Sequence, residues 1–162
     1  MTRIRRGLAC SWIALALAGG CASGGEGGDA FMTRSDLASK LDQAISATQW
    51  PPAIRPTSAA LVKSFEPERR FERGFETTLV QIANACAWYM AWTDTKASGD
   101  TADAENALRA MEEVVPTYGF ASGDPATVQF FKDIPAKARL GDPTGVNNFI
   151  KANGCRETLA AP

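Results

Sequence analysis

The feature that most constrains the fold is a long helical repeat over residues 67–98. Apolar side chains recur there every three or four residues, at Phe71, Phe75, Leu79, Ile82, Cys86 and Tyr89 or Met90. Residues 85–92 are apolar nearly all round, which in a soluble domain indicates burial on several sides. Gln81 and Asn84, together with the shortness of the apolar run, argue against a membrane span. The pattern predicts one central helix from Pro67 to about Ser98, with Gly99 as its stop.

Shorter helical patterns flank this segment and predict an all-α, single-domain helical bundle of about five helices, without strands of any length. The expected elements are a helix over residues 36–47 capped by Ser35, a short helical stretch over residues 58–65, a partner helix from Asp100 to Pro116, and two helices that open at Asp124-Pro125 and Asp142-Pro143.

The first 20 residues have the organisation of an export signal. Arg3, Arg5 and Arg6 form a basic start, and residues 8–18 form an apolar run within the roughly 7 to 15 residues of a signal h-region. This run is too short to span a bilayer, which takes about 20 residues. Residues 17–21 read Leu-Ala-Gly-Gly-Cys, which resembles the lipid-attachment segment of bacterial lipoproteins, with Ala18 where that family has Leu.

The resemblance implies that residues 1–20 are a signal peptide and that Cys21 receives lipid. Residues 21–30 would then hold the lipid-attachment Cys and a Gly-rich tether, and residues 31–162 would be the all-helical globular domain. The expected location is extracytoplasmic, lipid-anchored to a bacterial membrane. A secreted or soluble periplasmic protein is the alternative, because residues 16–18 also suit an ordinary signal peptidase.

The expected roles of the four cysteines follow from this organisation. Cys10 leaves with the signal peptide and Cys21 takes the lipid, so Cys86 and Cys155 remain in an oxidising compartment. We expect these two to form one disulfide that ties the last helix to the central helix. The alternative is a pair of buried, unpaired thiols.

Composition excludes several function classes. The chain contains no histidine, which removes the commonest general base and the usual zinc ligand sets. Without Arg3, Arg5 and Arg6 the mature chain has 14 basic and 18 acidic side chains, and it has no basic stripe, so we expect no nucleic-acid partner. We also expect no cofactor and no metal.

One group of candidate site residues is a cluster of carboxylates at positions 66, 68, 72 and 76. On a helix that begins at Pro67, the last three would share one face, as a solvated network of ion pairs with Arg69, Arg70 and Arg73. The alternative is a carboxylate-dependent hydrolase acting on envelope polysaccharide, with Glu72 and Glu76 as its acids.

Three tryptophans form the other group. Trp88 and Trp92 lie one helical turn apart, and Trp50 precedes two prolines in a loop, so together they are a candidate binding surface. Core packing is the alternative for all three. The expected function is that of a non-enzymatic binding or accessory module of the cell envelope, whose partner is an envelope protein or a cell-wall glycan.

Overall fold

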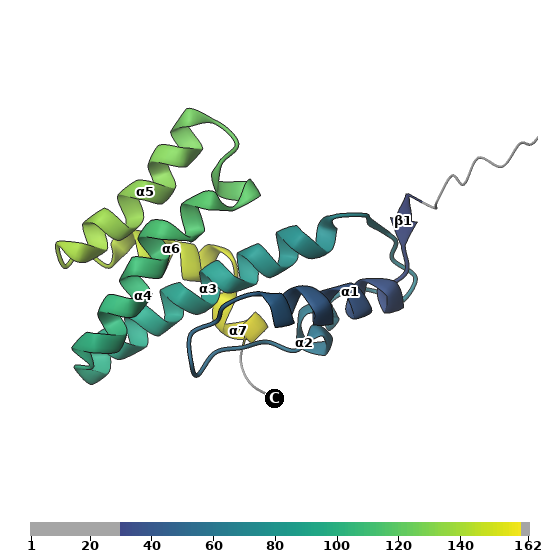
Figure 1. The fold of residues 1–162 in the computed structure, drawn as a ribbon, viewed down its shortest axis with the longest axis horizontal. Coiled ribbons are helices and arrows are strands. Elements are labelled where there is room, and N and C mark those ends of the chain that lie inside the picture. The colour runs from purple at the N-terminus through teal and green to yellow at the C-terminus, as the bar shows by residue number, and fades with distance from the viewer. Residues whose placement is uncertain (1–29, 160–162) are drawn as a thin grey trace, which may run out of the picture.

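The computed structural model describes residues 30–159. The predicted signal peptide, residues 1–20, and the predicted lipid-attachment site, Cys21, lie outside the described residues. The described part is an all-α bundle, as the helical patterns predict, and Figure 1 shows its other helices arranged around α3.

Seven α-helices lie within residues 30–159: α1 (Arg34–Ala47), α2 (Ser58–Val62), α3 (Phe75–Ser98), α4 (Thr101–Glu113), α5 (Pro125–Arg139), α6 (Thr144–Ala152) and α7 (Cys155–Leu159). Two short 3-10 helices, η1 (Val115–Thr117) and η2 (Gly119–Ala121), connect α4 to α5. Two strands of two residues each, β1 (Phe31–Met32) and β2 (Phe71–Glu72), pair in antiparallel fashion.

Helix α1 begins at Arg34 because Thr33, rather than the predicted Ser35, caps it. The Thr33 Oγ1 atom accepts a hydrogen bond from the backbone N–H of Asp36, and a carboxylate oxygen of Asp36 accepts one from the backbone N–H of Thr33, both at 3.1 Å. This capping box satisfies two backbone donors that the helix itself cannot pair. The reciprocal bonds also lower the pKa of Asp36 below its ordinary value, chiefly through the Thr33 hydroxyl.

The central helix α3 begins at Phe75 and not at Pro67, which corrects the predicted start. Residues 71–72 form β2 instead, and Gly74 follows with a φ of 93°. An L-residue with a Cβ atom is strained at that φ, so glycine allows the chain to turn there between strand and helix. The predicted end is confirmed, because α3 stops at Ser98 and Gly99 takes a φ of 81°.

The C-terminal half folds around the second half of α3. Asp100 and Asp124 cap α4 and α5, as the sequence predicts, with each carboxylate accepting backbone N–H hydrogen bonds from the first helical turn. The predicted disulfide is confirmed: Cys86 and Cys155 are bonded, with their Cα atoms 5.3 Å apart. The bond fixes α7 to the middle of α3.

Two clusters of buried apolar side chains share α3. The N-terminal cluster consists of Met32, Leu37, Leu41, Ile45, Leu61, Val62, Phe71, Val80 and Ala83. The C-terminal cluster consists of Ala85, Cys86, Trp88, Tyr89, Met90, Trp92, Ala104, Ala107, Leu108, Ala110, Met111, Val115, Ala121, Phe131, Ile134, Ala138, Val146, Phe149, Ile150 and Cys155.

Among the helices of residues 30–159, none combines the length and the hydropathy that crossing a membrane requires.

Candidate binding groove

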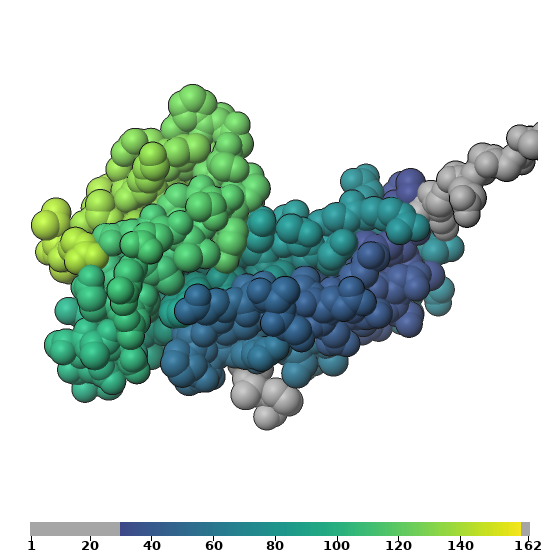
Figure 2. Space-filling model, in the orientation of Figure 1, coloured from purple at the N-terminus to yellow at the C-terminus, as the bar shows by residue number. Residues whose placement is uncertain are grey.

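A groove lies over α3, where the two clusters meet. Its floor is α3, one wall is the end of α1 with the chain that follows it to residue 54, and the other wall is α4. Its volume is about 1240 Å³. Figure 2 shows the surface of these segments, with the blue chain after α1 next to the teal and green surface of α4.

Small side chains keep the groove open. Ala47 ends α1, Ala91 lies on the floor, and Ala107 and Ala110 face them from α4. Short side chains let helices approach closely but cannot reach across the space beside them. Pro51, which is buried and fixed in φ by its ring, shapes the opposite wall. The groove therefore has an apolar floor that no side chain of residues 30–159 fills.

The structure brings two of the three candidate tryptophans into the groove. Trp50 is half-buried, lines the groove, and donates its indole N–H to the backbone oxygen of Ile45 at 2.9 Å. Trp88 also lines the groove, although only 7% of its surface is exposed. Trp92 is 4% exposed, belongs to the C-terminal cluster, and lies outside the groove lining.

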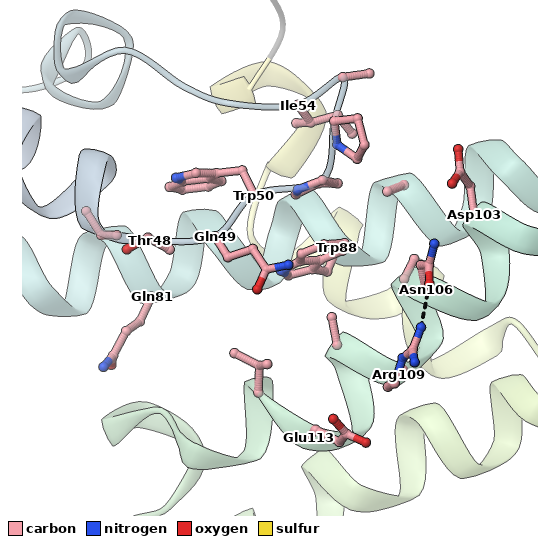
Figure 3. Close-up of a pocket in the computed structure, with 18 of the residues that line it drawn as sticks. Thr48, Gln49, Trp50, Ile54, Gln81, Trp88, Asp103, Asn106, Arg109 and Glu113 are labelled. Carbon is pink, nitrogen blue, oxygen red and sulfur yellow. Dashed lines mark hydrogen bonds between the residues drawn. The ribbon is translucent and has the colours of Figure 1, made fainter.

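Polar side chains surround this apolar floor. Figure 3 shows Gln49 and Trp50 extending from the chain after α1 over α3, near Trp88. The residues that face them from α4 are Asp103, Asn106, Arg109 and Glu113. An apolar floor with a few polar groups at its edge is the usual organisation of a binding site.

A buried amide joins the two sides of the groove. Asn84 is fully buried, and its Nδ2 atom donates a hydrogen bond to the backbone oxygen of Gln49 at 2.8 Å. Its Oδ1 atom accepts a hydrogen bond of 2.6 Å from the hydroxyl of Tyr118, a residue that also lines the groove. Burial raises the pKa of Tyr118 to about 12, so this hydroxyl keeps its proton at physiological pH.

The sequence also carries a signal that Asn84 is a buried group. An amide within an otherwise apolar stretch argues against a membrane span, but it also indicates a buried group that needs hydrogen-bond partners. Those partners, Gln49 and Tyr118, lie 35 and 34 residues away along the chain. Their identity therefore depended on the tertiary fold.

The groove carries more acidic than basic side chains. Asp94, Asp103 and Glu113 line it, whereas Arg109 is the one basic residue among its lining residues within residues 30–159. Asp94 forms an ion pair with Arg156 at 3.0 Å, and the guanidinium of Arg109 donates a hydrogen bond to Asn106. Asp103 and Glu113 form no ion pair within the described residues.

The carboxylate cluster does not form the predicted helix face. Glu68 and Glu72 precede the helix, because α3 begins at Phe75, and Glu72 lies exposed on β2. Glu76 lies in the first turn of α3 and accepts a hydrogen bond of 3.0 Å from the backbone N–H of Gly74. A second hollow of about 570 Å³ includes Glu72 among its lining residues but not Glu76.

Three or more His, Cys, Asp or Glu side chains do not gather into a metal-binding group anywhere in residues 30–159. Comparison of the chain with protein-family models, with curated proteins and with solved structures finds no match.

Proposed function

We propose that this protein is a lipid-anchored module of the bacterial cell envelope. It binds a partner in the groove over α3 without catalysing a reaction on that partner. The groove itself carries the proposal. Its volume of about 1240 Å³ exceeds the roughly 300 to 1,000 Å³ of ordinary small-molecule pockets, which favours an extended ligand such as a segment of a macromolecule.

The acids of the groove are poorly placed for hydrolysis. Two-carboxylate glycosidases hold their acids about 5 to 9.5 Å apart. Asp103 and Glu113 lie ten residues apart on the continuous helix α4, which separates their backbones by about 15 Å along the axis. Asp94 is already paired with Arg156. These positions support recognition of a partner rather than general acid and base catalysis.

The groove proposal is tested by site-specific photo-crosslinking in living cells. A photoreactive residue is introduced at Asn106, which is exposed on α4 within the groove, and in a control at Lys132, which is exposed on α5 outside it. We expect an envelope component to become linked to the protein at position 106 and not at position 132. Equal yields of the same adduct at both positions would contradict binding in the groove.

The anchor is tested separately with Cys21→Ala. The wild-type protein is expected in the membrane fraction, because several acyl chains hold a protein there far more firmly than one does. The variant is expected in the periplasm or the medium, and membrane retention of the variant would refute the anchor. Activity on cell-wall material that is lost in Glu72→Gln or Glu76→Gln would instead support the hydrolase alternative.

A further inference from the structure

The charge of the groove restricts what it can bind. Asp103 and Glu113 are exposed, lie at opposite ends of α4, and have no ion-pair partner within residues 30–159. Arg109 lies between them on the same helix, with its guanidinium bonded to Asn106. A ligand that brings negative charge to this wall meets two free carboxylates, whereas a ligand that brings positive charge finds two partners.

The ends of two helices also contribute to the electrostatic potential of the groove. Helices α1 and α4 both end at the groove, at Ala47 and Glu113, and neither has a basic residue in its last turn. A helix C-terminus carries about half a negative charge. The last turn of α1 has no basic residue of its own to offset it, whereas Arg139 of α5 pairs with Glu112 in the last turn of α4. The positive end of α4 lies near Asp103, and the carboxylates of Asp100 and Asp103 counter it there.

The shape of the groove fits a helix. The floor follows α3 from Thr77 to Ser98, about 30 Å at 1.5 Å per residue. A helix about 10 to 12 Å wide occupies roughly 120 to 170 Å³ per residue, so about 1240 Å³ accommodates two to three turns, about a third to a half of the length of the floor. Ala91 on the floor is partly exposed and presents a small side chain over which a neighbouring helix packs at an axis distance of about 8 to 10 Å, whereas Ala107 and Ala110 of α4 are 1% and 8% exposed.

From the charge and the shape together we infer that the occupant of the groove is a basic amphipathic helix of a partner protein. Its apolar face would lie on Trp50, Ile54 and Ala91, which are partly exposed in the groove, and its lysines or arginines would pair with Asp103 and Glu113. This inference rests on the proposed binding function of the groove and names the chemistry of the partner.

Synthetic peptides test this inference directly. One labelled peptide of about 14 residues has Leu at helical i, i+3, i+4 spacing and Lys elsewhere, and its match has Glu in place of every Lys. A neutral N-acetylglucosamine hexasaccharide serves as the glycan probe. Binding of the labelled peptides to the lipid-free chain of residues 22–162 is measured by fluorescence anisotropy, and binding of the sugar is measured directly by isothermal titration calorimetry. We expect the Lys peptide to bind at least tenfold more tightly than the Glu peptide.

Charge-matched variants localise the binding. Asp103→Lys combined with Glu113→Lys is expected to weaken the Lys peptide about tenfold, because it reverses two charges on the groove wall. Asp42→Lys combined with Glu157→Lys makes the same change in net charge at exposed positions outside the groove, and we expect it to weaken binding less than twofold. Equal losses from both double variants would mean that the peptide responds to net charge alone, and the inference would be overturned.

A steric pair separates shape from charge. Asn106→Trp places a large side chain in the groove without changing its charge, and Asn147→Trp does the same at an exposed position of α6 outside it. We expect only the first to abolish binding of the Lys peptide. One outcome would overturn the inference in favour of a glycan. In that outcome the sugar binds, the Lys peptide does not bind, and Asn106→Trp abolishes binding of the sugar. If neither probe binds but the cross-link at position 106 forms in cells, this inference fails while the proposed function stands.

Discussion

The N-terminal cluster and the C-terminal cluster share α3 but are held together differently. The N-terminal cluster relies on apolar burial, a capping box and a pair of two-residue strands. The C-terminal cluster contains the disulfide, and Arg139 on α5 adds ion pairs to Glu105 and Glu112 on α4. The groove therefore has one wall in a cross-linked part of the molecule and one wall in a part without a cross-link.

This difference indicates where the groove can change its width. The α4 wall belongs to the cross-linked part, whereas the wall formed by residues 47–54 is tied to α3 through Asn84. Segments with little covalent or apolar restraint open first in native proteins. We therefore expect the wall after α1 to be the one that moves when the groove is filled.

Removal of the disulfide should destabilise the protein most. Cys86→Ala combined with Cys155→Ala should lower the free energy of unfolding by about 4 kcal/mol, since the bond joins residues 69 apart and restricts the unfolded chain. Urea denaturation with and without reductant measures the loss. Reductant should destabilise the wild-type protein and leave the double variant unchanged. A variant as stable as the oxidised wild type would show that the cross-link does not distinguish the two clusters.

Leu41→Ala tests the stability of the N-terminal cluster. Leu41 is fully buried in the N-terminal cluster, so the truncation should cost about 3 kcal/mol through lost burial and the cavity left behind. Hydrogen exchange should then speed up in α1 and α2 while α4 to α6 stay protected. Loss of protection that is uniform over both clusters would mean that they unfold as one unit.

Asn84→Ala should loosen the connection between the walls. The change leaves the oxygen of Gln49 and the hydroxyl of Tyr118 without their partner, with an expected cost of about 2 kcal/mol. A double-mutant cycle with Tyr118→Phe should give a non-zero coupling energy. Tyr89→Phe is the matched control, because the buried Tyr89 hydroxyl has no hydrogen-bond partner within residues 30–159 and its removal should not destabilise the protein.

The smallest effect concerns the ion pairs of Arg139. Its side chain is 45% exposed, so solvent screens these ion pairs and Arg139→Gln should change the free energy of unfolding only slightly. The hydrogen bond from Arg139 lowers the pKa of Glu112, so this small contribution is present above the ordinary carboxyl pKa of 4.5 and is lost as the pH falls through the lowered value. Urea titrations at pH 7 and pH 3 should show that wild type and variant differ less at the lower pH.

Local sequence signals predicted much of the fold. Asp100, Asp124 and Gly99 mark helix ends by chemistry that acts over three or four residues, and the structure confirms them. The predicted start of α3 at Pro67 was wrong, because the apolar spacing of Phe71 and Phe75 suits one continuous helix as well as it suits a strand followed by a helix. The turn at Gly74 and the pairing of β2 with β1, about 40 residues earlier in the chain, decide in favour of the strand and the later helix start.

The groove itself could not be predicted from local sequence patterns. Trp50 and Trp88 were predicted as binding residues from their types, but the space beside them arises where alanines from three separate segments meet. The absence of a filling side chain has no signature along a chain, since a run of helical alanines also suits tight packing.

Figure 1 shows the chain entering the bundle at β1, at one end of the long axis, with the turn between α3 and α4 at the other end. Helix α1 leads from β1 to the groove over 14 residues, about 21 Å of rigid helix. With the proposed lipid on Cys21, the start of α1 would be the part of the helix nearest to the anchor along the chain, and up to about 21 Å of rigid helix would separate it from the groove.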